Sequence, residues 1–353
     1  MEIDEKKVEE AVGKVFGELG VAVTGPLILL GDRLGLWAAM AGAGPVTPDQ
    51  LAARTGTVER YIREWLCGVA VAGYVGYDPA DGTFRLSPEM ALVIAGDDSP
   101  ASLIGVFAGF PGLWSDLDTV EGFFRSGGGM GWGDHHPALN DAQARFTRPM
   151  YRAALVDGWI AALDGVTARL RNGARVADIG CGVGFSTLLM AEAFPKSSFV
   201  GYDFHAPSIE QANAHAVAHG LAGRVRFETV AAKDIAERDF DLVTMFDCLH
   251  DMGDPRGASS HIRTLLKPDG VWMLVEPIAG DQPSDNVGNP VSRLYYNAST
   301  MICVPTSLDQ EVGEALGAQA GEAKLTAVLT GAGFTHVRRA TEGPFNMVLE
   351  ARP

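Results

Sequence analysis

Residues 176–185 constrain the fold of this chain more than any other segment, and they read V-A-D-I-G-C-G-V-G-F. An apolar run that contains one acidic residue is followed by glycines at alternate positions and then by a further apolar stretch. Glycine lets the backbone turn sharply and approach a ligand closely, and the amides at a helix start attract an anionic group. The segment therefore predicts a buried strand, a glycine loop and a helix start that together hold a nucleotide-type cofactor.

The spacing of these glycines bears on which cofactor fits. Dinucleotide-binding loops follow the pattern G-x-G-x-x-G, whereas here the third glycine comes one residue early, with Phe185 in the usual place of glycine. This spacing favours S-adenosylmethionine over NAD. A second apolar run ends in Asp203, close to where such folds place a carboxylate that binds ribose hydroxyls. Asp203 is also placed to cap the helix expected near Pro207, and both roles use acceptor oxygens.

From Arg175 onward, apolar runs and helical patterns alternate regularly along the chain. Such alternation is typical of a parallel, doubly wound α/β sheet. Two last runs follow the break at Gly331-Ala332-Gly333 so closely that they predict a terminal hairpin. The predicted strands are 175–179, 198–203, 224–230, 240–246, 270–276, 334–340 and 345–351.

Residues 8–94 have a mainly helical pattern that ends in a short hairpin. Thr47 is placed as a helix cap, Pro48 as the first helical residue and Gly56 as the stop. A second helical pattern, 58–71, precedes two short β segments on either side of a turn at Asp81-Gly82. The order of helix, helix and wing predicts a winged-helix domain.

A winged helix raises the question of DNA binding, and the charge argues against it. Residues 1–95 hold 8 Lys and Arg against 13 Asp and Glu, a net charge of −5. Phosphate contacts dominate affinity for DNA, so an acidic module lacks the main driving force. The apolar segments 21–23, 26–30 and 34–37 instead predict a surface that a second copy of the chain covers. Ordinary core packing is the alternative for these segments.

Two parts of the chain resemble known families. The D-x-G-x-G-x-G run from Asp178 to Gly184 resembles motif I of class I S-adenosylmethionine-dependent methyltransferases. The N-terminal helices resemble the dimerisation domain of plant and bacterial small-molecule O-methyltransferases. The resemblance implies a Rossmann-like domain with a mostly parallel seven-stranded sheet, preceded by a mainly α winged-helix-like domain. The implied domains are 1–98 for dimerisation, 99–170 as a helical connector that lines the substrate pocket, and 171–353 for the cofactor.

The same resemblance assigns chemical roles. The run 250–254 reads H-D-M-G-D and resembles the H-D-x-x-D loop of plant-type O-methyltransferases, in which the histidine, here His250, is the general base. Glu276 matches a carboxylate that orients the base. The family's second orienting glutamate falls at Gln319, a departure that leaves Glu322 as a substitute or as a helix cap. The implied ligands of S-adenosylmethionine are Asp178, Gly180, Gly182, Gly184, Asp203, Phe204, Asp234 and Asp247.

Aromatic and Met side chains in the connector suggest where the methyl acceptor binds. One of them lies within a glycine-rich stretch, 126–133, and the others follow it at helical spacing, and they would suit an apolar or aromatic ligand. A stripe of this kind at helical spacing is more often core packing. The expected acceptor contacts are Trp132, Phe146, Met150 and Tyr151, with Arg293 from the segment 290–308.

The sequence does not predict a metal site. The adjacent histidines His135 and His136 point apart, and no partner spacing follows them. The cysteines are scattered and include no C-x-x-C pair, which indicates reduced thiols without a zinc site or a disulfide framework. They are Cys67, Cys181, Cys248 and Cys303.

The net charge of −16 disfavours nucleic acid and anionic membranes as partners. The longest apolar runs are broken by Gly25-Pro26 and Gly31-Asp32 before they reach the ~18 residues of a membrane span. The start, 1–5, is acidic where a signal peptide is basic. The expectation is therefore a cytoplasmic protein that acts on a small molecule.

Three functions follow from these patterns. The leading hypothesis is a homodimeric enzyme that moves a methyl group from S-adenosylmethionine to a hydroxyl of a small, aromatic or apolar molecule, with His250 as base. His250 as a residue that only lines the pocket is the alternative within this hypothesis. A winged-helix transcription regulator that senses S-adenosylmethionine is an alternative from another class. A methyltransferase-like protein that uses S-adenosylmethionine for other chemistry, or that has lost activity, is the third.

Overall fold

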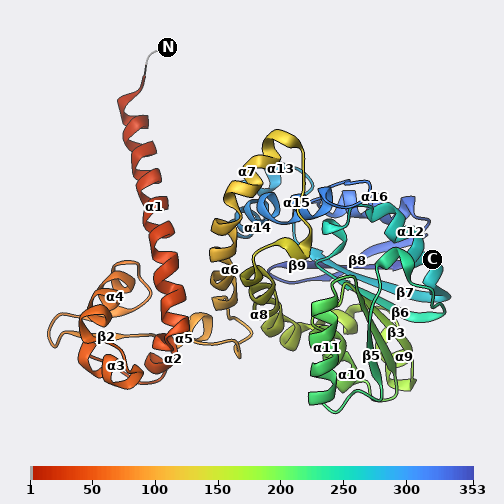
Figure 1. Ribbon diagram of the computed structural model, residues 1–353, viewed down its shortest axis with the longest axis horizontal. Helices are drawn as coiled ribbons and strands as arrows, with labels where there is room; N and C mark the ends of the chain where they lie inside the picture. Colours follow the sequence, from red (N-terminus) through yellow and green to blue (C-terminus); the bar gives the residue numbers. More distant parts are fainter. Residues whose placement is uncertain (1–2) are drawn as a thin grey trace. The chain divides into compact units, whose positions relative to one another are not determined.

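The computed structural model describes residues 3–353 and contains two compact units (Figure 1). The N-terminal unit comprises Met1–Pro111 and Ala138–Met150, and the C-terminal unit comprises Gly112–Pro137 and Tyr151–Pro353. The compact units divide the chain at positions other than 98 and 170, and the expected domain boundaries stay a prediction. Of the expected connector, 99–111 and most of helix α8 (Pro137–Ala154) belong to the N-terminal unit, whereas 112–137 and 151–170 belong to the C-terminal unit.

The N-terminal unit has the predicted order of helices and wing. Its elements are α1 (Glu5–Arg33), α2 (Leu36–Met40), α3 (Pro48–Thr55), α4 (Glu59–Val71), the antiparallel hairpin β1 (Gly76–Asp78) and β2 (Thr83–Arg85), α5 (Pro88–Ile94) and the start of α6 (Ile104–Ser115). Thr47 forms a capping box with Gln50, and Gly56 ends α3 at a φ of 65°. The prediction of a winged-helix domain is confirmed.

Two tryptophans anchor α1 to the winged helix. The rings of Trp37 and Trp65 lie 4.6 Å apart between centroids, and their indole nitrogens donate to the carbonyls of Ile28 and Leu27 at 2.9 and 2.8 Å. Gly31 leaves the room that they need, because a Cβ there would lie 2.2 Å from the Trp37 ring. Buried indoles with satisfied donors fix the C-terminal part of α1 in this unit.

Helix α1 corrects the expectation about apolar runs. It continues through Gly25-Pro26 and Gly31-Asp32, where the sequence predicts breaks. By length and composition α1 is able to cross a membrane, and it is the one such helix among residues 3–353. One helix of this kind is weak evidence for a membrane, because the core helix of a soluble protein or a signal sequence passes the same test.

The C-terminal unit is built on a seven-stranded sheet with the order β5-β4-β3-β6-β7-β9-β8. The parallel strands are β3 (Arg175–Ile179), β4 (Ser198–Asp203), β5 (Val225–Thr229), β6 (Phe240–Phe246) and β7 (Leu266–Pro277). Strand β9 (Asn346–Arg352) lies antiparallel between β7 and β8 (His336–Glu342). The doubly wound, mostly parallel sheet and its terminal hairpin are confirmed. The strand order changes direction between β3 and β6, where ligands of such sheets bind beyond the carboxyl ends.

Helices cover both faces of this sheet (Figure 1). The α-helices are α7 (Leu117–Ser126), α9 (Val166–Asn172), α10 (Phe185–Ala193), α11 (Ala206–Ala218), α12 (Pro255–Leu265), α13 (Pro283–Asn286), α14 (Pro290–Met301), α15 (Cys303–Leu308) and α16 (Glu322–Gly331). The short turns that matter for the site are η1 (Trp132–Asp134), η4 (Ala232–Asp234) and η5 (Leu249–Asp251), and a π-helical turn, η2 (Leu155–Trp159), follows α8.

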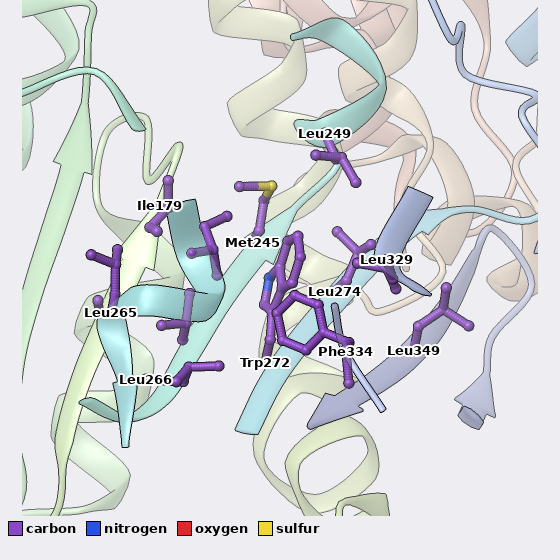
Figure 2. Packing of buried hydrophobic residues seen from close by; sticks show 14 of the residues in the cluster. Ile179, Met245, Leu249, Leu265, Leu266, Trp272, Leu274, Leu329, Phe334 and Leu349 are labelled. Carbon is purple, nitrogen blue, oxygen red and sulfur yellow. The ribbon is translucent and has the colours of Figure 1, made fainter. Parts of the chain in front are cut away.

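The core of the C-terminal unit explains why the strands were predictable. Every residue of β6 is buried, and a strand buried on both faces reads as a mostly apolar run, which in β6 is interrupted by Asp241 and Thr244. Figure 2 shows Trp272 of β7 against Phe334, with 5.4 Å between ring centroids. The prediction for β7 began four residues late, at 270 instead of 266. Leu266 pairs with Phe240 across a register shift, and the polar residues between hide this extension.

Candidate active site

Three glycines shape the loop between β3 and α10. Gly180, Gly182 and Gly184 have φ values of 70°, 53° and 81°, in the left-handed region that favours glycine. A Cβ at Gly180 would lie 2.4 Å from Cys248 Sγ, and one at Gly184 would lie 2.5 Å from the Phe227 ring. A Cβ at Gly182 would meet nothing within 4 Å. The outer glycines are thus required by packing, whereas the middle one faces open space that a ligand can fill.

Asp178 lies beneath this loop. Its side chain is fully buried and accepts hydrogen bonds from the hydroxyls of Ser186, Thr187 and Thr244 at 2.7, 2.6 and 2.9 Å. Burial raises the pKa of Asp178 to about 6, although the three hydroxyl donors oppose that rise. The structure therefore gives Asp178, expected as a cofactor ligand, a supporting place that ties β3, α10 and β6 together.

Asp203, the expected ribose ligand, ends β4 beside the glycine loop. One carboxylate oxygen accepts from Gly182 N at 2.9 Å, and the other accepts from His205 N at 2.8 Å. Burial raises the pKa of Asp203, while these backbone amides oppose the rise. Each oxygen keeps a second lone pair, so the same carboxylate is able to hold the loop and accept from a ligand hydroxyl.

Phe204 and Asp234 lie at the same edge of the sheet. Phe204 follows β4 directly and is 54% exposed, and Asp234 is exposed in η4, after β5. An exposed aromatic ring offers a face for a base, and carboxylate oxygens accept from ribose hydroxyls and amino groups. With the open position at Gly182, the residues present fit the nucleoside part of S-adenosylmethionine.

His250 lies in η5, just past the carboxyl end of β6, and is 4% exposed. Its Nδ1 lies 2.5 Å from Glu276 Oε2 at the end of β7. The other oxygen of Glu276 accepts from Leu249 N at 2.9 Å, which holds the carboxylate against η5. The structure thus brings together the two residues that the sequence assigned as base and orienter.

Two residues that sequence reasoning missed lie on the other side of the imidazole. Asp251 Oδ1 is 3.2 Å from His250 Nε2. Cys303, the first residue of α15, brings its thiol to the same place, within 4.8 Å of ligand atoms of both residues. The H-D pair in the sequence was a signal for Asp251. No local pattern marks Cys303, because α15 reaches η5 only in the folded chain.

The two carboxylates control the protonation of His250. Burial alone lowers the pKa of His250, but the charges of Asp251 and Glu276 outweigh burial and hold this pKa well above its usual value. Burial raises the pKa of the Cys303 thiol to about 11. These shifts favour the imidazolium form of His250, between two carboxylates, and the protonated form of the Cys303 thiol.

Asp247 opens the loop that carries His250. Its φ of 49° is uncommon for a residue other than glycine, and such strain is often found at functional sites. Asn346 Nδ2 donates to Asp247 Oδ1 at 2.6 Å. Burial, and next the charge of Glu276, raise the pKa of Asp247 to about 7. The neighbouring Cys248 packs against Gly180, so this loop adjoins the glycine loop.

The expected second orienter has other partners. Glu322 lies in the first turn of α16 and forms an ion pair with Arg339 at 2.5 Å. Gln319 is buried, and its Nε2 donates to the Ala318 carbonyl at 3.0 Å. The second carboxylate beside His250 is Asp251, which arrives from the neighbouring position in the chain.

The expected acceptor contacts are divided between the two units. Trp132 lies half-buried in η1 of the C-terminal unit, whereas Phe146 and Met150 lie on the part of α8 that belongs to the N-terminal unit. Tyr151 is buried and packs against Phe246, with 5.1 Å between ring centroids, so it is part of the core beneath the His250 loop. Arg293 is exposed on α14. Their contact with an acceptor stays a prediction.

The adjacent histidines have separate environments. His135 is buried, with Nδ1 at 3.2 Å from Asp116 Oδ2 and Nε2 at 3.2 Å from Thr306 Oγ1, while His136 is exposed. The four cysteines are free thiols.

Family models agree with this division of the chain. Residues 170–316 match the model of a methyltransferase domain, and residues 22–95 match that of the Rv2258c-like winged HTH domain. The C-terminal unit therefore contains a methyltransferase domain and the N-terminal unit a winged HTH domain, as the sequence predicted. The resemblance found in the glycine loop is confirmed.

Individual proteins extend the comparison. A ubiquinone biosynthesis O-methyltransferase of Haemophilus ducreyi is 33% identical over 110 residues, which are 29% of this chain and 44% of that relative. The chain thus spans less than half the length of this curated relative.

Solved structures share the whole fold at low identity. The mitomycin 7-O-methyltransferase MmcR aligns over 99% of this chain and 100% of its own, at 20% identity and a TM-score of 0.72. Human N-acetylserotonin methyltransferase, in complex with S-adenosylmethionine, aligns over 99% and 98%, at 15% identity and a TM-score of 0.69. The second structure holds the cofactor that the glycine spacing predicts here.

Proposed function

We propose that this chain is an S-adenosylmethionine-dependent methyltransferase that acts on a hydroxyl of a small, aromatic or apolar molecule. The observation that carries the proposal is the His250–Glu276 pair, which lies past the same edge of the sheet as the glycine loop and Asp203. A nucleoside-binding edge beside a buried acid–base pair is what a proton-removing transferase requires. The S-adenosylmethionine ligands proposed here are Gly180, Gly182, Gly184, Asp203, Phe204, Asp234 and Asp247.

The protein's own groups account for proton removal. Bound S-adenosylmethionine would supply a methyl group on a positively charged sulfur, which leaves alignment and deprotonation of the acceptor to the protein. A phenol has a pKa of about 10, so a base has to take its proton as the oxygen attacks. Neutral His250 accepts that proton at Nε2, while Glu276 holds the proton on Nδ1 and stabilises the imidazolium that results.

Asp251 sets a condition on this step. Asp251 Oδ1 lies 3.2 Å from His250 Nε2, and although burial lowers the pKa of His250, the charge of this carboxylate raises it and so favours the protonated imidazole. The acceptor hydroxyl has to take the place of this carboxylate, and His250 has to lose its Nε2 proton before it acts as base. Acceptor binding and activation of the base are therefore coupled in this proposal.

The acceptor pocket and the oligomer belong to the same proposal. Trp132, Phe146, Met150, Tyr151 and Arg293 remain the proposed acceptor contacts, and 99–170 the proposed pocket-lining segment. A homodimer would cover the apolar side chains that α1 exposes, among them Phe16 at 73% and Val23 at 70% exposure. Burial of that face by a second copy would also account for the apolar composition of α1 without a membrane, in keeping with a cytoplasmic protein.

Calorimetry with S-adenosylmethionine tests the first half of the proposal. Wild-type protein is expected to bind, and Asp203→Ala is expected to lose about 10- to 100-fold in affinity, as the removal of a charged hydrogen-bond partner does. Asp269→Ala is the matched control, since Asp269 is a carboxylate near the opposite end of the sheet that pairs with Arg169. Equal affinity of both variants and the wild type would sink the assigned cofactor site.

Mass analysis of products tests the second half. Incubation with S-adenosylmethionine and a panel of phenols, alcohols and amines is expected to add a methyl group to a hydroxyl-bearing member. Cofactor binding without any methylated product would instead favour a protein that has lost activity, and a product of another kind would favour other chemistry.

A transcription regulator is a second candidate function, because the chain contains a winged HTH domain. Its charge of −5 over residues 1–95 argues against DNA contact. A mobility-shift assay with genomic fragments at low salt separates the two functions, because a regulator would retain DNA in a salt-dependent manner.

A further inference from the structure

A cluster of three metal-ligating side chains lies beside the imidazole of His250. His250, Asp251 and Cys303 each offer one ligand atom, and these three atoms lie within 4.8 Å of one another. His250 is 4% exposed and Cys303 8%, so a metal bound between them would be shielded from water. Nitrogen, oxygen and sulfur donors thus converge from two elements, η5 and α15.

One oxygen of this cluster is directed at the imidazole. Asp251 Oδ1 is buried and forms an ion pair with His250 Nε2 at 3.2 Å, without the geometry of a hydrogen bond. A cation held between these two atoms would supply the positive charge that the imidazolium otherwise supplies to this carboxylate.

The opposite side of the imidazole is arranged as in metal-bound histidines. Glu276 takes His250 Nδ1, and a carboxylate on the second ring nitrogen fixes the tautomer and the ring orientation of a ligating histidine. Nε2 is thereby the nitrogen that points toward Asp251 and the cluster. The support that orients His250 for catalysis would orient it equally for a metal.

The two elements that carry the ligands are held together by hydrogen bonds. Ser307 Oγ donates to the Met252 carbonyl at 2.8 Å, and Gln310 Nε2 donates to the Asp251 carbonyl at 2.8 Å. Gln310 Oε1 accepts from Gly253 N at 3.0 Å. These contacts position Cys303 relative to η5 before any ligand binds, and a preorganised ligand set binds a metal more tightly.

We propose that His250, Asp251 and Cys303 form a binding site for zinc or a similar divalent transition metal, with one coordination position left open. Imidazole, carboxylate and thiolate are the ligands that zinc prefers, in tetrahedral sites, whereas magnesium and calcium prefer oxygen alone. Binding displaces the thiol proton of Cys303 and the Nε2 proton of His250 to solvent, as metal binding to such groups requires. No electron transfer is involved.

A metal at this site would affect methyl transfer by the protein. This effect alone rests on the proposed function. The metal takes the lone pair of His250 Nε2 that would accept the proton of the methyl acceptor. Zinc is therefore expected to inhibit methyl transfer, and a chelator is expected to restore it. Metal binding itself does not depend on the methyltransferase proposal.

Cobalt binding to the whole protein tests the site directly. Wild-type protein titrated with Co²⁺ is expected to show a thiolate-to-cobalt charge-transfer band, which zinc then abolishes by displacement. Cys303→Ser is expected to remove the band, and Cys67→Ser, at an exposed cysteine of α4, is expected to keep it. No band in the wild type, or a band that survives Cys303→Ser, would overturn the proposal.

Two further variants guard against loss of folding. Asp251→Asn, which changes a proposed ligand, and Glu276→Gln, which changes the group that orients His250, are each expected to keep the band. Glu276→Gln is expected to weaken zinc binding about 10- to 100-fold, the range seen when a group around a metal ligand is lost, and Asp251→Asn at least as much. Circular dichroism establishes that each variant is folded. Folded variants with unchanged zinc affinity would contradict the proposed ligand set.

Inhibition of methyl transfer by zinc is measured separately from metal binding. If the protein transfers methyl groups, zinc is expected to lower the wild-type rate, and at least 10-fold more zinc is expected to be needed for the same fractional loss in Cys303→Ser. Equal zinc sensitivity of the two proteins would refute the inhibitory role. A protein that transfers no methyl group still shows the cobalt band if the site exists, so failure of the proposed function is distinguishable.

Discussion

Helix α1 and strand β6 are both rich in apolar residues, yet their environments differ. Every residue of β6 is buried, whereas only 17% of the most apolar window of α1 is buried. Its exposed side chains include Val12, Phe16, Leu19 and Val21. The C-terminal unit covers its own apolar strands with helices, while α1 leaves a long apolar face open. An uncovered face of this kind is typical of a surface that contacts another molecule.

The largest effect is expected from a charge on the open face of α1. Phe16 is 73% exposed, and Phe16→Glu would place two charges in a symmetric contact between two copies. Burial of one large apolar side chain contributes about 1.5–3 kcal/mol, so the loss in both copies should weaken self-association at least 100-fold. Sedimentation velocity over a range of concentrations measures this.

Val71→Glu is the matched control for that experiment, because Val71 is 92% exposed on α4, outside α1. It is expected to leave self-association unchanged. A wild-type protein that stays monomeric at all concentrations would contradict the prediction, because the apolar side chains of α1 would then remain exposed to solvent.

The next effect concerns the buried site of the C-terminal unit. His250→Ala is expected to lower turnover by roughly 100-fold or more while S-adenosylmethionine affinity stays the same, because a general base acts on the acceptor and not on the cofactor. Single-turnover kinetics measure the rate and calorimetry the affinity. His219→Ala is the control, since His219 is 45% exposed by side chain and pairs with Glu192 at the surface.

Unchanged turnover in His250→Ala would reduce His250 to a residue that lines the pocket. The two units would then differ only in how their apolar residues are packed, and no catalytic role would be assigned to the buried His250 site of the C-terminal unit.

The smallest effects are expected in the glycine loop, where two variants distinguish a glycine that packing requires from a glycine that a ligand approaches. Gly184→Ala would bring a Cβ within 2.5 Å of the Phe227 ring and would also strain a backbone with a φ of 81°, so it is expected to lower the free energy of unfolding by about 2–5 kcal/mol. Gly182→Ala meets nothing within 4 Å and is expected to cost only about 1–2 kcal/mol for its positive φ. Its main effect should be weaker cofactor binding. Denaturant unfolding and calorimetry measure both variants.

A Gly182→Ala variant with full cofactor affinity would show that no ligand approaches the middle glycine. The open space beside Gly182 would then be solvent, and the cofactor would have to lie elsewhere along the edge of the sheet.

Much of the fold was predictable because its signals are local. The strands of the C-terminal unit came within a few residues of their observed bounds, since most of them are short apolar runs between turns, although β8 is half-buried and mixed in composition. Thr47 and Gly56 marked the ends of α3 by capping chemistry. The start of β7 and the continuity of α1 were mispredicted, because β7 depends on pairing with β6, and α1 depends on contacts with Trp37 and Trp65.

The residues of the candidate site that come directly after a strand in the sequence were predictable. The glycine loop, Asp203 and His250 follow strands directly, and the topology of parallel sheets places such residues at one edge. The position of Asp178 beneath the loop was not visible, because its three hydroxyl partners come from α10 and β6.

Local composition thus decided the strands, the glycine loop, the winged helix and the class of cofactor, because each depends on residues a few positions apart. Contacts between distant segments decided the rest: that Asp251 and not Glu322 stands beside His250, and that Cys303 joins them. Such contacts depend on how η5, β7 and α15 pack, and packing joins residues whose separation along the chain carries no pattern.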